Sequence, residues 1–218
     1  MKRIKKRQLK EDEFVSTLNK FLNFVKARTK EIIALGVAVC VLILFFIGLR
    51  YIKAQNLSKQ SQVAGQIFNL GKDLDSNPQN LNKLESMTGK GKFSRLAFLV
   101  LATHFVEKGD FAKALAYLEK MPKSPKDILY FEAEDLRGQI FYQLKNYDKA
   151  IEIYKGIEAL NPKEYSLDAV ISHRAEALEA KGDTEAALAL YKKLESDFAQ
   201  TYYGYDASLK TKRLETRK

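Results

Sequence analysis

Cysteine and tryptophan are nearly missing from this chain of 218 residues. Cys40 is the only cysteine, so neither an internal disulfide nor a cysteine-based zinc site can form within one chain. Tryptophan is absent, which leaves tyrosine and phenylalanine as the large rings that can fill a core. Roughly 160 residues follow the most apolar stretch, enough for one ordinary domain that is held together by packing alone.

Charge is missing from Ile32 to Leu49, which reads IIALGVAVCVLILFFIGL. A helix of eighteen residues covers roughly 27 Å, close to the thickness of a bilayer's hydrocarbon core. Lys30 on one side and Arg50 and Tyr51 on the other suit the headgroup region. The stretch predicts a transmembrane helix over residues 31–51. A buried core helix is the alternative, but such helices are usually shorter and carry a polar face.

The basic residues on the two sides of this stretch are unequal in number. Residues 1–30 hold ten Lys and Arg, whereas residues 50–69 hold three. Because basic flanks stay on the cytoplasmic side, we expect a cytoplasmic N-terminus and a C-terminal domain across the membrane, in the periplasm of a bacterium. A cleaved signal peptide is the alternative. The long basic region and the poor cleavage site in GLRYIKAQ favour a retained, single-pass anchor in the inner membrane.

Most of the formal net charge of +10 lies in residues 1–30, which carry +7. This distribution favours contact of the basic cytoplasmic tail with an anionic leaflet, so no nucleic-acid binding is expected of the large domain. Binding of RNA or the ribosome by the tail remains the alternative. Apolar residues at helical spacing within the tail predict an amphipathic helix that lies on the inner leaflet or docks a partner. They are Phe14, Leu18, Phe21, Leu22 and Val25.

Residues 52–92 are predicted to form leading helices and a loop. Residues 51–74 contain no proline, and Val63, Ile67 and Leu70 share one helical face. Pro78 is placed to open a second, short helix that runs through Ser86.

Residues 93–218 contain a repeat. KGDFAKALAYLEKM, LKNYDKAIEIYKGI and KGDTEAALALYKKL begin at Lys108, Leu144 and Lys181. Each opens with a turn, then places a small residue and, four positions later, a large one. A period of 36 or 37 residues between the small residues is typical of an α-solenoid, in which helical hairpins stack. The small residues are Ala114, Ala150 and Ala187, and the large ones are Leu118, Tyr154 and Tyr191.

The predicted fold is therefore all-α. A single N-terminal transmembrane helix precedes an α-solenoid of about three helical hairpins, with a leading hairpin before them and a capping helix between Gln200 and Arg217. These units resemble the tetratricopeptide repeat, and the best match runs from Leu136 to Pro162. Gly138 stands where that family has a small residue on the first helix, and Phe141 stands where it has an aromatic one.

The resemblance implies that a partner binds in a concave groove lined by the first helix of each hairpin. This groove would be polar and net acidic, which suits a basic or polar peptide segment; the alternative is that its residues are ordinary exposed helix positions. The implied residues are His104, Glu107, Lys108, Glu132, Asp135, Gln139, Tyr142, Gln143, Ser172, Glu176 and Glu179.

No catalytic constellation accompanies these residues. His104 and His173 belong to different repeats, and neither has a second histidine or a cysteine at ligand spacing. The sequence therefore predicts a protein that is not an enzyme, with no metal, no cofactor and no small-molecule substrate.

The whole arrangement is similar to the YfgM-type ancillary subunit of the bacterial Sec translocon. That resemblance implies a non-enzymatic, membrane-anchored interaction module, with translocon subunits, periplasmic chaperones or client peptides and inner-membrane lipid as partners. One alternative is an envelope scaffold in cell division or cell-wall synthesis. Another is an adaptor that works through its cytoplasmic tail, with the solenoid merely structural.

Overall fold

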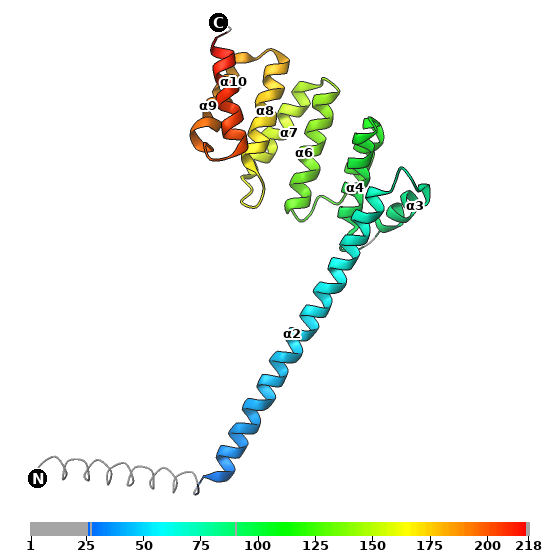
Figure 1. Cartoon of the computed structure of the whole chain (residues 1–218), viewed down its shortest axis with the longest axis vertical. Helices are drawn as coiled ribbons and strands as arrows, with labels where there is room; N and C mark the ends of the chain where they lie inside the picture. Colours follow the sequence, from blue (N-terminus) through cyan, green and yellow to red (C-terminus); the bar gives the residue numbers. More distant parts are fainter. Residues whose placement is uncertain (1–25, 27, 90, 217–218) are drawn as a thin grey trace, which may run out of the picture. The chain divides into compact units, whose positions relative to one another are not determined.

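A computed structural model of the chain describes residues 26, 28–89 and 91–216. The predicted amphipathic helix, with its apolar residues from Phe14 to Val25, lies outside the described residues. The chain divides into two compact units, residues 1–61 and 62–218. Helix α2, Thr29–Lys72, contributes its first part to one unit and its last eleven residues to the other (Figure 1). The apolar stretch and the first of the predicted leading helices are therefore one continuous helix.

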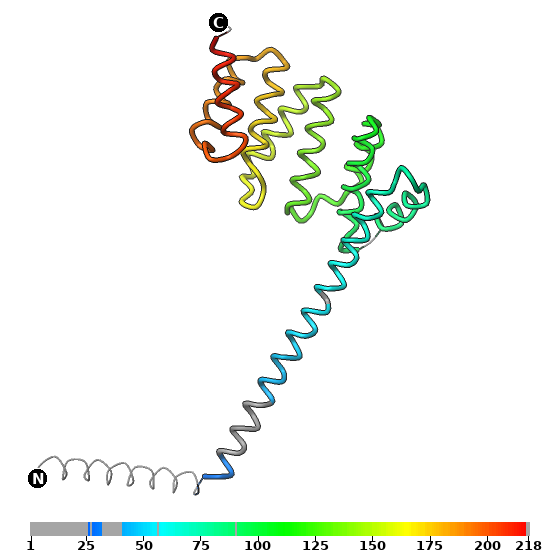
Figure 2. The backbone as a smooth tube through the Cα atoms, in the orientation of Figure 1, coloured from blue at the N-terminus to red at the C-terminus, as the bar shows by residue number. Residues whose placement is uncertain are grey.

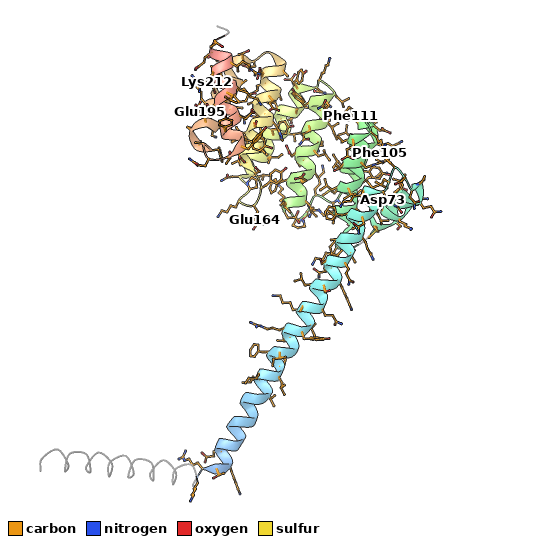
Figure 3. The ribbon with its side chains drawn as sticks, in the orientation of Figure 1. Asp73, Phe105, Phe111, Glu164, Glu195 and Lys212 are labelled. Atoms are coloured by element: carbon orange, nitrogen blue, oxygen red, sulfur yellow. The ribbon has the colours of Figure 1, made fainter. Side chains whose placement is uncertain are left out.

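The described apolar residues of α2 in the first unit are exposed. Their side chains project from the helix (Figure 3), and the rings of Phe45 and Phe46 contact each other edge to face, with centroids 6.0 Å apart. In the described part of the chain, one helical segment, Val41–Lys72, is long and apolar enough to cross a membrane, by length and composition, and none of its apolar window is buried. The exposed large side chains in the first unit are Val41, Leu42, Ile43, Leu44, Phe45, Phe46, Ile47, Leu49, Tyr51, Ile52 and Leu57.

The second unit is a row of paired helices, as the repeat predicts (Figures 1 and 2). After α3 the helices pack as three hairpins, α4 with α5, α6 with α7 and α8 with α9. Each hairpin packs on the next. The last helix, α10, packs on α9 and α8 in the place predicted for the capping helix. The bounds are α3 Pro78–Met87, α4 Ser94–Glu107, α5 Phe111–Lys120, α6 Ile128–Gln143, α7 Tyr147–Leu160, α8 Leu167–Lys181, α9 Thr184–Asp197 and α10 Tyr202–Glu215.

The turn between the two helices has the same structure in all three hairpins. In each, a residue with positive φ is followed by an Asp or Asn whose side chain accepts a hydrogen bond from a backbone N–H in the first turn of the second helix, which caps that helix. Glycine provides the positive φ in the first and third turns, and Lys145 (φ 58°) provides it in the second. The pairs are Gly109–Asp110, Lys145–Asn146 and Gly182–Asp183.

The small and large positions of the repeat are buried as predicted. Ala114, Ala150 and Ala187 are fully buried, and each large residue four positions later is nearly so. In the second hairpin the partner of this large residue is Gly138, where a Cβ atom would lie 2.5 Å from Cε1 of Tyr154. The tyrosine ring therefore occupies the space that a side chain at position 138 would need.

An ion pair joins the first hairpin to the second. Arg95, on α4, donates a hydrogen bond from Nη1 to Oδ2 of Asp127 at 2.8 Å. Asp127 is also the N-cap of α6, because its Oδ1 accepts from the backbone N–H of Tyr130. The Arg95 side chain is only 8% exposed, so its charge depends on this one carboxylate.

Candidate protein-interaction surface

The residues predicted to form a groove lie on α4, α6 and α8, the first helices of the three hairpins, except Lys108, which directly follows α4. Contacts between neighbouring helices connect them into one surface, which we call the first-helix face. Asp135 on α6 contacts His173 on α8, and Glu176 on α8 contacts Lys210 on α10. The surface differs along its length: it is open and apolar beside α4, buried in the middle, and closed by ion pairs beside α10.

The end of the first-helix face beside α4 contains an open cavity of about 600 Å³, which we call the α4 cavity. It lies within the second unit, between the end of α2, α4 and the start of α6. Phe68 and Ile128, 52% and 54% exposed, offer apolar surface there to solvent. The full lining is Phe68, Gly71, Lys72, Asp75, Leu96, Leu99, Val100, Thr103, His104, Glu107, Ile128, Leu129 and Glu132.

Gly71, which lines this cavity, lets the last turn of α2 approach α4 closely. A Cβ atom at Gly71 would lie 2.5 Å from Cγ1 of Val100. The same last turns of α2 place Ile67 in a buried cluster with Leu84 and Leu101, which fixes the helix end against α3 and α4. The side of the cavity that α2 provides is therefore held by packing.

The rim of the α4 cavity is charged. Lys108 contacts Asp75 at 2.7 Å, and His104 lies 3.9 Å from the same carboxylate. The hydrogen bond from Lys108 holds the pKa of Asp75 below its usual value. Glu107 and Glu132 are exposed on the same rim. The three carboxylates of Asp75, Glu107 and Glu132 therefore outnumber the two ammonium groups, those of Lys72 and Lys108, on this rim.

The middle of the first-helix face is a buried polar network around Asp135. Its carboxylate accepts hydrogen bonds from Gln139 at 3.1 Å and from the Tyr165 hydroxyl at 3.2 Å. The Nδ1 atom of His173 lies 2.9 Å from its other oxygen. Burial disfavours the charged imidazole, but the hydrogen bond and the charge of Asp135 outweigh this effect and raise the pKa of His173.

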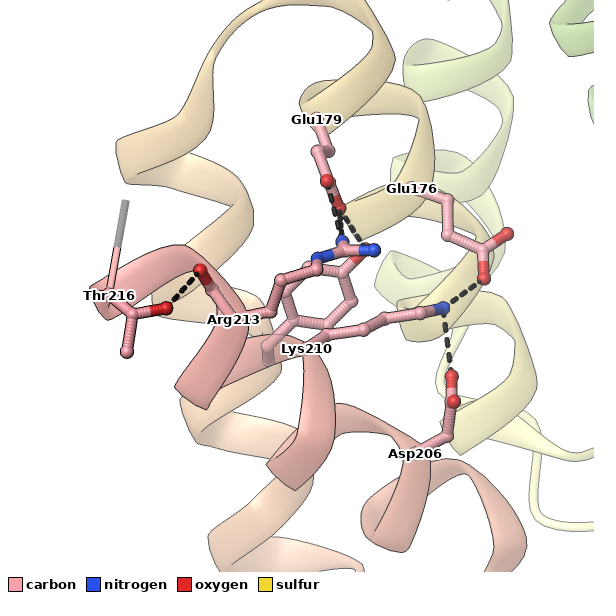
Figure 4. A network of polar contacts seen from close by, with 7 residues as sticks. Glu176, Glu179, Asp206, Lys210, Arg213 and Thr216 are labelled. Carbon is pink, nitrogen blue, oxygen red and sulfur yellow. Dashed lines mark hydrogen bonds and ion pairs between the residues drawn. The ribbon is translucent and has the colours of Figure 1, made fainter. Parts of the chain in front are cut away.

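The end beside α10 is closed by ion pairs (Figure 4). Lys210 contacts Glu176 at 2.6 Å and Asp206 at 2.8 Å. Arg213 contacts both carboxylate oxygens of Glu179, at 2.6 and 2.8 Å. The carboxylates of Glu176 and Glu179, predicted to receive a basic peptide, therefore have basic partners within the chain.

The predicted groove residues thus fall into three groups. His104, Glu107 and Glu132 meet at the α4 cavity, and Lys108 contributes the ammonium that contacts Asp75. Asp135, Gln139 and Ser172 are buried or bonded in the middle. The remaining residues lie toward α10, where Gln143 is exposed, Tyr142 is half-buried, and Glu176 and Glu179 are paired.

Besides His173 and Tyr165, which contact Asp135, sequence reasoning missed two sets of residues on this face. Phe68, Gly71 and Ile128 belong to the α4 cavity but lie outside the repeated segments. Lys210 and Arg213 belong to the helix that was predicted only as a cap. A signal existed for the second set, because Asp206, Lys210 and Arg213 recur at helical spacing on one side of α10.

Stacked helical hairpins with a buried small residue facing a large ring define this chain as an α-solenoid, a class whose known members bind other proteins. The family model of the tetratricopeptide repeat-like domain matches residues 23–159, more than half of the chain. The chain belongs to that family, whose domains are generally non-catalytic interaction modules. No curated protein and no solved structure matches the chain in the corresponding searches.

The family match ends at residue 159, near the end of α7. Helices α8, α9 and α10 continue the arrangement beyond it. No group of three or more His, Cys, Asp or Glu side chains suited to a metal ion occurs among the residues that the structure describes.

Proposed function

We propose that this protein is a membrane-anchored interaction module that binds protein segments at the α4 cavity. The observation that carries the proposal is the apolar surface of Phe68 and Ile128 beside the acidic rim of Glu107 and Glu132. An apolar side chain can fill the cavity while a neighbouring Lys or Arg pairs with the rim. The occupant best suited is therefore a segment in which an apolar anchor stands next to a basic residue.

The proposed anchor is the apolar stretch Ile32–Leu49. The larger number of basic residues before this stretch than after it supports a basic tail in the cytoplasm and a solenoid across a bacterial inner membrane, in the periplasm. The exposed apolar side chains from Val41 to Leu49 support the assignment of this stretch as the anchor, because they avoid contact with water when the helix lies in lipid.

The particular role proposed is that of an ancillary subunit of the Sec translocon, which links the channel to periplasmic chaperones or client peptides. It rests on the overall likeness to the YfgM-type family, in the order of basic tail, single span and repeat domain. An envelope scaffold for cell division or cell-wall machinery is the competing role.

Crosslinking in native membranes followed by capture of the full-length protein tests both levels of the proposal. Translocon subunits and periplasmic chaperones among the captured proteins would support the particular role. Division or wall-synthesis proteins without translocon subunits would replace it by the scaffold role. Capture by a chain truncated after Ala54 separates partners of the tail and span from partners of the solenoid.

Substitutions at the α4 cavity test the binding site itself. Phe68→Asp and Ile128→Asp each remove apolar contact area, worth roughly 1.5–3 kcal/mol if fully buried by a partner, so we expect about a tenfold or larger loss of solenoid-dependent capture. Ile128 is the first residue of α6, where an acidic side chain suits the helix dipole, so the fold should tolerate the change.

Leu144→Asp changes a similarly exposed residue away from the cavity and serves as the control. Equal capture by all three variants would contradict the proposed site.

A further inference from the structure

Helix α10 carries an exposed apolar stripe on the side that faces away from the solenoid. Tyr202, Tyr205 and Leu209 are 74%, 66% and 49% exposed, and Lys212, labelled in Figure 3, continues the line. Steps of three, four and three residues keep these four side chains on one side of a helix. We call them the α10 stripe. The opposite side of α10 is packed against α8 and α9 through Gly204, Ala207, Thr211 and Leu214.

Large apolar residues are not expected to stay exposed at this end of the unit. Each earlier first helix is covered by the helix that follows it, as α6 is covered by α7 and α8 by α9. No element of the described chain covers the α10 stripe in this way. Two tyrosines and a leucine in line on one helix form the kind of patch that binds another helix.

The order of residues in the α10 stripe fits a second copy of itself. If two α10 helices lie antiparallel, with the two-fold axis between the two stripes at the level of residue 207, each stripe residue faces the residue of the other copy that is equally far from position 207. Tyr205 then faces Leu209 of the other copy, and Tyr202 faces Lys212. An aromatic ring meets an aliphatic side chain in the first pair and an ammonium group in the second, which are two favourable contacts.

A parallel arrangement lacks this complementarity, because it would place Lys212 against Lys212. An isologous two-fold contact also forms each favourable pair twice. We propose that the α10 stripe is the surface through which two copies of this protein associate, with their α10 helices antiparallel.

The contact is small. Four side chains per copy fall well short of the roughly 800 Å² per partner that stable complexes bury. The association should therefore be weak between copies in dilute solution. It becomes stronger if both copies are held in one bilayer, because tethering raises their effective concentration. That strengthening rests on the proposed membrane anchor, whereas the pairing of residues does not.

Disulfide trapping between two differently tagged full-length copies tests the pairing. Both copies carry Cys40→Ala, and one carries Tyr205→Cys while the other carries Leu209→Cys. Helix axes about 8–10 Å apart bring facing Cα atoms within the roughly 4.4–6.8 Å that a disulfide spans. We expect mild oxidation in native membranes to yield the mixed Tyr205→Cys with Leu209→Cys product several-fold above either like-with-like product.

Two further variants make the outcome decisive. Ala189→Cys places a thiol at an exposed position of α9 and measures random collision. Tyr205→Glu combined with Leu209→Glu should abolish trapping through a Tyr202→Cys and Lys212→Cys pair. Because positions 205 and 209 are exposed, that double change should leave the unfolding temperature unaltered.

Predominant like-with-like products would overturn the antiparallel arrangement. Trapping no greater than with Ala189→Cys, or trapping onto a different protein, would show that the α10 stripe does not bind a second copy. If the chain proves not to be anchored, the same mixed product should still form at high protein concentration, which separates failure of the anchor from failure of this contact.

Discussion

At the scale of single residues, the second hairpin depends on the absence of a side chain at Gly138. A Cβ atom there would lie 2.5 Å from Cε1 of Tyr154, and both Gly138 and Tyr154 are buried. We expect Gly138→Ala to lower the free energy of unfolding by about 1–3 kcal/mol, because the ring or a helix must move. Denaturant unfolding of the full-length protein, followed by circular dichroism, measures the change.

Gly156 provides the matched control for this substitution. It lies within α7 in the same hairpin, and a Cβ atom there would meet nothing within 4 Å. Gly156→Ala should raise the free energy of unfolding by up to about 1 kcal/mol, because alanine favours the helix more than glycine does. Two changes of the same sign would contradict the steric explanation.

His173 is the second position at which one residue determines a property of the whole domain. Asp135 faces it from α6, Glu176 lies on its own helix, and Lys210 approaches from α10. The pKa of His173 is raised above 6.5 in the folded state, so the folded protein binds the proton more tightly than the unfolded chain does. The resulting stabilisation is complete below pH 6.5 and is lost as the pH rises through the folded-state pKa.

We therefore predict that the free energy of unfolding falls as the pH is raised from about 6 to 8, in the range where a histidine loses its proton. Urea unfolding at a series of pH values measures this slope. Asp135→Asn should lower the pKa of His173 in an NMR titration, with His104→Gln used to assign the two histidine signals. A slope that survives unchanged in His173→Gln would rule out this histidine as its source.

At the scale of helices, the repeated turn explains why so much of the solenoid could be predicted. Gly–Asp marks the turns at 109–110 and 182–183, and the small-to-large spacing follows each turn in the sequence itself. Local signals of this kind fix where a helix begins and which side is buried. The second turn could not be predicted in this way, because its residue with positive φ is Lys145 and not a glycine.

The state of the predicted groove residues was harder to predict, because it depends on contacts between helices that are distant in the sequence. The spacing of Glu176 and Glu179 correctly places them on one side of α8, but nothing within that helix indicates that Lys210 and Arg213 neutralise them. The α4 cavity likewise requires that the end of α2 packs beside α4, a contact between segments about thirty residues apart. Helical periodicity contains no information about such contacts.

The joint between the first two hairpins depends on Asp127, which caps α6 and neutralises the buried Arg95. Asp127→Ala removes the cap and leaves a guanidinium group without its carboxylate. We expect a loss of roughly 3–5 kcal/mol in the free energy of unfolding, mainly from the unpaired charge. Asp183→Ala removes only a cap, that of α9, and should cost about 1 kcal/mol.

The double variant Asp127→Ala with Arg95→Leu separates the two contributions. With the buried charge removed, the loss caused by Asp127→Ala should fall toward that of Asp183→Ala. Chemical unfolding of the four proteins measures the coupling. A loss at Asp127 that does not depend on residue 95 would show that the cap alone accounts for it.

At the scale of the whole molecule, the proposed function requires that the apolar part of α2 lies in lipid. Leu44 and Leu57 are equally exposed on this helix, at 67% and 66%, but only Leu44 belongs to the uncharged stretch. The large apolar residues of that stretch contribute roughly −6 kcal/mol to insertion, at about −0.3 to −0.6 each. Two lysines near its centre cost about 5–7 kcal/mol and would cancel this gain.

Leu42→Lys with Leu44→Lys should therefore move the protein from the membrane fraction to the fraction extracted by alkaline carbonate. Ala54→Lys with Leu57→Lys adds the same charge to the same helix beyond the stretch and should leave the protein in the membrane fraction. If the two double variants behave alike, the uncharged stretch is not what holds the protein in the membrane. The proposed function would then have to operate without a membrane anchor. Residues 42 and 44 lie outside the second unit and its buried clusters, so neither double variant should disturb the packing of the solenoid.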